Sequence, residues 1–80
     1  MPISDTAAIE RIARVLAAER ASANAHGDRS SAGPDVDATW PDYRDQALAV
    51  LKTLREPDAA MAAAGDPDIW EKMVLAAIGD

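Results

Sequence analysis

Apolar residues recur at helical spacing near the start of the chain. They occupy positions i, i+3, i+4 and i+7, which places them on one face of a helix. They are Ile9, Ile12, Ala13 and Leu16. Ser4 and Asp5 precede this stripe and are suitable N-cap residues, because their side-chain oxygens can accept from free backbone N–H groups. The pattern predicts a first helix over residues 5–23.

A second helical face is predicted over residues 40–55. Its apolar members are Trp40, Tyr43, Ala47, Leu48, Leu51 and Leu54. Thr39 is placed to cap this helix, with Pro41 in the first turn, where a missing N–H costs no hydrogen bond. Asp42 stands three residues after Thr39, as in a capping box. Pro57 ends the run, because the residue before a proline avoids helical geometry.

Two shorter helices are predicted in the rest of the chain. The first covers residues 57–64, is rich in alanine, and ends at Gly65, which suits the left-handed conformation that often closes a helix. Asp66 and Pro67 then begin a last helix over 67–78, as its N-cap and its first residue. The apolar residues of this helix are Ile69, Trp70, Met73, Val74, Ala77 and Ile78, and Gly79 closes it.

Residues 24–38 lack this periodicity. The segment reads NAHGDRSSAGPDVDA, and its Gly, Pro and small polar residues predict a loop of about 15 residues, which is long for a small helical domain. It is either a linker or a functional loop. We favour the linker, because Val36 is its one large apolar residue. The sequence therefore predicts a single all-α domain of three to four helices: a long N-terminal helix, this loop, and a compact three-helix unit over 40–78.

The composition predicts a small core. Apolar residues make up 49% of the 80 residues, but 19 of them are alanine and none is phenylalanine. A chain this short buries only about 60% of the surface of its unfolded form, so its stability margin is small. The absence of cysteine excludes disulfides and thiolate metal sites. Self-association remains available, and we expect the first helix to pack on residues 40–78 or on a second copy in a homodimer.

The net charge of −6 is unevenly distributed. Residues 1–33 hold four acidic and four basic residues, whereas residues 34–80 hold ten acidic against four basic, so the whole excess lies in the second part. An acidic surface repels phosphate backbones, which argues against direct nucleic-acid binding. No stretch is apolar enough to span a membrane, and the first residues lack the pattern of a secretory signal. We therefore expect a cytoplasmic protein.

No constellation of residues predicts catalysis, a cofactor or a metal. The serines have no neighbouring base, and His26, the one histidine, falls in the predicted loop. The acidic pairs Asp35-x-Asp37 and Asp66-x-Asp68 lack the ligand spacing, central Gly and closing Glu of an EF-hand. Both pairs lie in turns, where carboxylates are normally solvated. The sequence predicts a protein that is not an enzyme and that needs no cofactor.

Five aspartates have two possible explanations. They are Asp42, Asp45, Asp58, Asp66 and Asp68. They could form a face that mimics phosphates, yet each falls in or just before the first turn of a predicted helix. There the helix dipole and the free N–H groups favour a carboxylate by about 0.3–1 kcal/mol. We favour this second explanation.

The tryptophans are the stronger indication of an interaction. Trp40 and Trp70 can each be a core anchor, which is the commoner role, or a binding hot spot. Both begin helices, so we expect them near the same end of the bundle. The candidate interaction residues are Trp40, Tyr43, Trp70, Asp42 and Asp45.

The order of landmarks in the second half of the chain resembles a known pattern. It runs Trp40-x2-Tyr43-x3-Ala47-Leu48, then Arg55-Glu56-Pro57-x3-Met61-x2-Ala64-Gly65, then Trp70-x2-Met73. This order, over about residues 38–78, is similar to one found in small uncharacterised bacterial and phage or prophage proteins. The resemblance implies a cytosolic helical accessory protein and brings no catalytic residues with it.

Two functions therefore remain open. The first is a non-enzymatic helical module that binds a protein partner, for which the tryptophans and leucines would form the contact. The second is an acidic inhibitor that mimics nucleic acid and occupies the binding surface of a nucleic-acid-binding protein. The two differ in their response to salt, because only the second depends mainly on charge.

Overall fold

The computed structural model describes residues 3–24 and 32–79. These residues form helices and contain no strand, which confirms the predicted all-α class. The elements are α1 (Ala8–Asn24), α2 (Ala32–Thr39), a 3-10 turn η2 (Trp40–Tyr43), α3 (Arg44–Leu54), α4 (Ala59–Ala64) and α5 (Pro67–Ile78).

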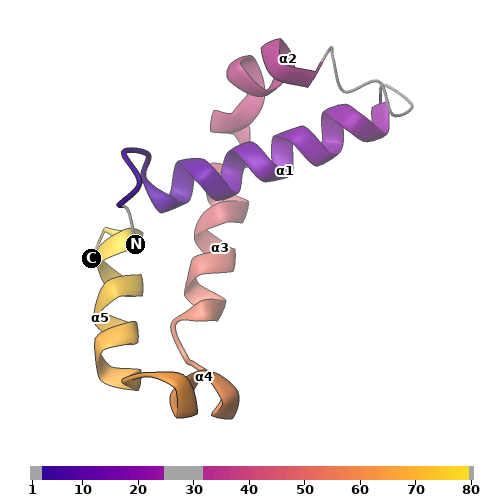
Figure 1. The fold of residues 1–80 in the computed structure, drawn as a ribbon. Coiled ribbons are helices and arrows are strands. Elements are labelled where there is room, and N and C mark those ends of the chain that lie inside the picture. The colour runs from indigo at the N-terminus through magenta and orange to yellow at the C-terminus, as the bar shows by residue number, and fades with distance from the viewer. Residues whose placement is uncertain (1–2, 25–31, 80) are drawn as a thin grey trace.

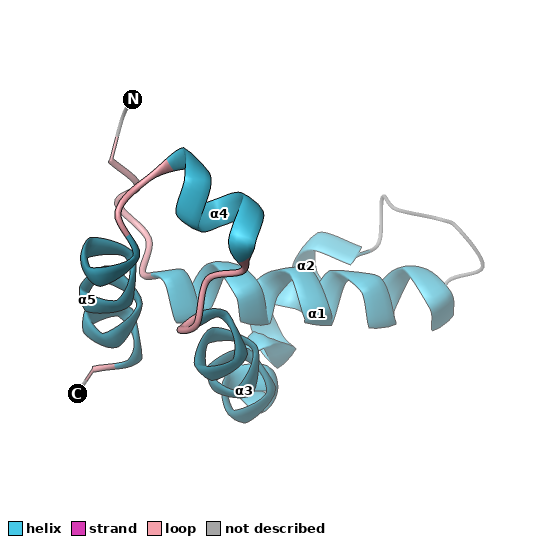
Figure 2. Ribbon diagram, turned by 90° about the horizontal axis from the view of Figure 1, so that it is seen from below, coloured by secondary structure: helices cyan, strands magenta, loops and turns pink. Residues whose placement is uncertain are grey.

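Helix α1 lies across the first turns of α3, with α2 on the opposite side of it from α3 (Figure 1). Helices α3 and α5 run side by side in opposite directions, and α4 connects their ends (Figures 1 and 2). Helix α1 contacts α2, η2 and α3 extensively and touches α5 much less. The first helix therefore packs within the chain, which is one of the two positions predicted for it.

The most deeply buried side chains of α1 and α3, two helices that lie close together, are small. Ala13 and Ala17 lie one turn apart on α1 and are 0% and 2% exposed, and Ala47 on α3 is 0% exposed. Because alanine has no atoms beyond Cβ, two helices can approach closely where alanines face each other. Leu51 on α3 and Val74 on α5 complete the buried side chains of the described residues.

Arg14 connects α1 to the segment that follows it. Its guanidinium donates to Asp37 of α2 and to Glu10 of α1, each at 2.8 Å, and lies 5.4 Å from the centre of the Trp40 ring. The hydrogen bonds to Asp37 and then to Glu10 raise the pKa of Arg14 above its usual value, so the guanidinium stays charged. One side chain thus holds α1, α2 and η2 together.

The predicted loop over residues 24–38 is wrong in its second half. Residues 32–39 form α2, and Asn24 belongs to α1, while residues 25–31 lie outside the described residues. Pro34 is tolerated because the first turn of a helix needs no N–H donor. Val36 is half-buried and Asp37 binds Arg14, so packing on α1 overrides the weak local preference of this segment.

The N-terminal boundaries of three helices also differ from the prediction. Helix α4 begins at Ala59 and not at residue 57, because Asp58 is its N-cap. Ser4 accepts from the N–H of Thr6 at 3.1 Å in a local turn, so α1 begins at Ala8 and not at residue 5. Thr39 does not cap the next helix, because its hydroxyl donates to the carbonyl of Asp35 at 2.6 Å. The predicted capping box of Thr39 and Asp42 is therefore wrong, and a 3-10 turn precedes α3.

The ends of α4 and α5 follow local rules with one exception. Asp58 accepts from the N–H of Met61, and Asp66 accepts from the N–H groups of Asp68 and Ile69. Helix α5 covers 67–78 as predicted and ends at Gly79, whose φ of 96° is left-handed. The sequence predicts a left-handed Gly65 as well, which is wrong. The backbone of Gly65 is extended, because the chain passes directly into the extended N-cap of α5.

We expect Ala13→Leu to lower the free energy of unfolding by about 1–3 kcal/mol, because the added side chain has no space between α1 and α3. Glu19→Leu, which introduces the same side chain on the exposed face of α1, is the control and should shift stability by less than about 0.5 kcal/mol. Urea unfolding followed by circular dichroism measures both. Equal losses from the two variants would contradict this packing.

We expect Arg14→Gln to lower the midpoint of urea unfolding more than Arg11→Gln does. Both residues are arginines of α1, but Arg11 is exposed and takes part in none of the ion pairs of the described residues, whereas Arg14 binds Asp37, Glu10 and the Trp40 ring. The difference should shrink in Asp37→Asn protein, since one partner is then absent. If the two arginine variants differ in unfolding midpoint by as much in Asp37→Asn protein as in the original, Asp37 does not contribute to the stabilisation by Arg14.

Candidate protein-interaction surface

The structure separates the two tryptophans. Trp40 lies just before α3 and is half-buried beside Arg14. Trp70 is half-buried at the other end of α3, where its indole N–H donates to the carbonyl of Leu54 at 2.7 Å. Because α3 spans about 16 Å between these points, the expectation that both tryptophans share one end of the bundle is wrong.

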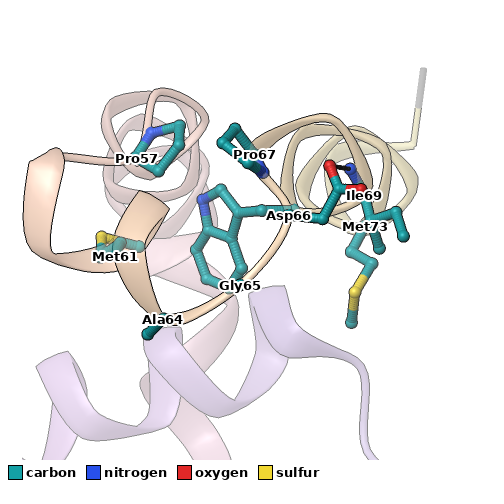
Figure 3. Close-up of a pocket in the computed structure, with 9 residues that line it drawn as sticks. Pro57, Met61, Ala64, Gly65, Asp66, Pro67, Ile69 and Met73 are labelled. Carbon is teal, nitrogen blue, oxygen red and sulfur yellow. Dashed lines mark hydrogen bonds between the residues drawn. The ribbon is translucent and has the colours of Figure 1, made fainter.

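Trp70 forms part of an apolar groove between α4 and α5. The groove has a volume of about 340 Å³ and is shown in Figure 3. Its lining residues are Pro57, Met61, Ala64, Gly65, Asp66, Pro67, Ile69, Trp70 and Met73. We call it the α4–α5 groove. Asp66 is its one charged lining residue, and that carboxylate already caps α5, so the groove offers mainly apolar contact.

The turn between α4 and α5 creates the groove. Pro57 follows α3 and Asp58 caps α4, so the chain reverses direction beyond the end of α3. Gly65 and Asp66 are both extended, which turns the chain back into α5. The hydrogen bond from Trp70 to Leu54 then fixes the start of α5 against the end of α3.

The outer face of α5 carries two exposed large apolar side chains. Ile69 is 55% exposed and Met73 is 62% exposed, and Figure 3 shows both on the same side of the helix. Ala76 continues this line and is exposed as well. We call Ile69, Met73 and Ala76 the α5 stripe. The sequence places Ile69 and Met73 with the core residues of the last helix, yet Val74 is the one residue of α5 that is buried.

A second groove lies between α1, α2 and the start of α3, with a volume of about 450 Å³. Its lining residues are Ala17, Arg20, Ala21, Asp35, Thr39, Asp42, Tyr43 and Gln46. The structure thus brings two of the candidate residues, Asp42 and Tyr43, to one place. Asp45 is exposed in the first turn of α3. This groove mixes both signs of charge with polar groups, so it favours no particular class of partner.

The five aspartates lie at helix starts and form two groups. Asp58 and Asp66 cap α4 and α5, while Asp42, Asp45 and Asp68 stand in first turns. Asp42, in η2, and Asp45, in the first turn of α3, lie around the beginning of α3. The other three lie beyond its end, around α4 and the start of α5 (Figure 1). Stabilisation of helix starts therefore accounts for all five carboxylates.

The described residues contain no group of three or more His, Cys, Asp or Glu side chains that could hold a metal ion. Ser4 is exposed and bonded within its own turn. His26, Ser30 and Ser31 lie outside the residues that the structure describes. In the same described ranges, no helix combines the length and apolar character that crossing a membrane requires.

The chain matches no protein-family model, no curated protein and no solved structure. The resemblance to small bacterial and phage proteins therefore stays a prediction.

We expect Trp70→Phe to lower the free energy of unfolding by about 1 kcal/mol, since phenylalanine cannot donate to Leu54. Trp40→Phe is the matched control. Its ring makes no hydrogen bond in the described structure and phenylalanine can still face Arg14, so the loss should be smaller. Chemical unfolding followed by circular dichroism measures both variants. A larger loss for Trp40→Phe would contradict the assigned role of Trp70.

Proposed function

We propose that this protein is a non-enzymatic helical protein-interaction module. Its contact surface comprises the α5 stripe and the adjoining α4–α5 groove. The proposal is supported above all by one observation, the joint exposure of Ile69 and Met73 beside an apolar groove. Single exposed apolar residues are common on protein surfaces, whereas a contiguous apolar patch marks an interaction site.

The exposed side chains are large enough to contribute to binding. More than half of the surface of Ile69 and of Met73 is open to water. Burying it against a partner would contribute about 1 kcal/mol for each side chain. Trp70 would add to this contact from the wall of the groove, where its position is fixed by Leu54. A tryptophan held in place loses little conformational entropy when a partner binds.

Trp40 has a different role in this proposal. Its ring faces the Arg14 guanidinium of α1 and the residue is half-buried, so we assign it to the stability of the fold. The other candidates lie at the same end of α3 as Trp40, away from the α5 stripe. They are Asp42, Tyr43 and Asp45. The interaction surface thus retains Trp70 alone among the five candidate residues.

The acidic-inhibitor alternative has less support. Helix-start chemistry accounts for its carboxylates, and they are divided between the two ends of α3. As the sequence resemblance implies, we further propose that the protein acts in the cytoplasm as an accessory protein of bacterial or phage origin.

A photo-crosslinking amino acid placed at residue 73 tests the proposal in the cells that make the protein. We expect a discrete crosslinked protein species from position 73. Position 15 is the matched control, because Val15 on α1 is also a large apolar side chain and is 59% exposed. Identical products from the two positions, or no product from position 73, would reject the α5 stripe as the contact surface.

Charge reversal at Asp42 and Asp45 separates the two functions in the same assay. The crosslinked species from position 73 should survive Asp42→Lys combined with Asp45→Lys, and it should be lost with Ile69→Ser. An acidic inhibitor would lose its complex with the Asp42→Lys and Asp45→Lys pair and keep it with Ile69→Ser. Its complex would also weaken steeply as salt is added.

A further inference from the structure

We infer that the partner which covers the α5 stripe is a second copy of this chain, packed through an antiparallel pairing of the two α5 helices about a two-fold axis. This inference rests on the proposed function, since it uses the same surface. It adds the identity of the partner and the direction in which the two helices run.

The charges beside the stripe are the first reason. Asp68 and Lys72 are four residues apart, so they lie on one side of α5, along one edge of the stripe. Both are exposed. Neither takes part in an ion pair in the described part of the chain. The same edge of the helix therefore carries one negative and one positive charge at successive turns.

A two-fold axis makes this pair self-complementary. When two identical helices pack face to face and antiparallel, the axis runs perpendicular to both helices and parallel to the contact plane, so each edge faces the same edge of the other copy. Asp68 of one copy then lies opposite Lys72 of the second copy, and the reverse pair forms by symmetry. In this register Ile69 of one copy packs beside Met73 of the other.

The surface of the single chain is the second reason. Its accessible surface is 5976 Å², whereas a compact monomer of 8.4 kDa exposes about 4600 Å². The difference of about 1400 Å² is larger than the roughly 800 Å² that each partner buries in a stable interface. The radius of gyration of 14.9 Å is also above the roughly 11.6 Å of a compact chain of this length.

The core is too small to offset that exposure. Among the described residues, the buried side chains are three alanines, Leu51 and Val74, and no large side chain is completely buried. Chains of this size without disulfides or metals commonly gain the missing burial by association. A second α5 would cover Ile69 and Met73, and the exposed Ala76 leaves space for a close approach.

Helix α1 offers a rival pairing that serves as the control. Val15 is exposed, with Arg11 and Glu19 one turn to either side of it. The charges there could also pair across a two-fold axis. However, one valine supplies much less apolar surface than Ile69 and Met73 together, and Val15 lines neither of the two grooves described above.

Sedimentation equilibrium between 10 μM and 1 mM protein tests the inference, with charge swaps at both candidate interfaces. We expect a dimer, and we expect Lys72→Asp or Asp68→Lys alone to raise its dissociation constant about tenfold, because the axis creates each like-charge contact twice. The double variant D68K/K72D restores the opposite pairs and should return the dissociation constant to within about threefold of the original. Arg11→Glu should leave it unchanged.

The relative direction of the two α5 helices is tested by disulfide formation. The chain permits this test because it has no cysteine of its own. A mixture of Ile69→Cys and Met73→Cys chains should form disulfide-linked dimers under mild oxidation faster than either chain does alone. A parallel pairing would show the reverse, because residue 69 would then face residue 69. Faster linkage of either single variant overturns the antiparallel arrangement.

The outcomes also separate this inference from the proposed function. A strict monomer up to 1 mM, or a dimer that responds to Arg11→Glu and not to Lys72→Asp, overturns the inference. If residue 73 still crosslinks to a different protein, the interaction module stands with another partner. If residue 73 crosslinks to nothing and the chain is monomeric, both proposals fall. Circular dichroism of each variant confirms that the exposed substitutions leave the helices intact.

Discussion

The close approach of α1 to α3 is the contact on which the rest of this structure depends. A chain with 19 alanines and no phenylalanine cannot fill a wide space between helices with large side chains. It can bring two backbones together, and the almost complete burial of Ala13, Ala17 and Ala47 is consistent with such close packing of α1 and α3. Dispersion attraction falls quickly with distance, so close packing of small groups recovers part of what large groups would supply. With α1 in this position, Arg14 reaches Asp37 and Trp40 and holds α2 against α1.

The C-terminal helices are attached by fewer interactions. Helix α5 buries Val74 toward the rest of the chain and is held at its start by the hydrogen bond from Trp70 to Leu54. Helix α4 has no buried residue and serves mainly to reverse the chain. The molecule therefore has a tightly packed region around α1 and a more open one around α4 and α5. The apolar groove and the α5 stripe lie in the open region, where a partner can add contacts without displacing existing ones.

What could be predicted from the sequence depended on how local each cause is. The helix of residues 67–78 and its two ends follow from Asp66, Pro67 and Gly79, all of which act on neighbouring backbone groups. Helix α2 could not be predicted in this way, because it is held by Arg14, 23 residues from Asp37. The predicted positions of the two tryptophans are wrong for the same reason. Both begin helical segments, but only the path of α3 and α4 decides that Trp40 and Trp70 lie at opposite ends.

The exposure of Ile69 and Met73 can nevertheless be connected to the sequence. Successive residues of an α-helix are turned by 100°, so Ile69 and Val74 point about 140° apart. A helix that packs on one neighbour usually presents an apolar arc of about 100°. The apolar residues of α5 therefore cover more of its circumference than α3 alone can bury, and the structure turns Val74 inward and leaves Ile69 and Met73 outside. Within the chain α5 contacts α3 and, much less, α1, and Ile69 and Met73 stay exposed, so an arc this wide is explained if a further neighbour packs on that side of α5.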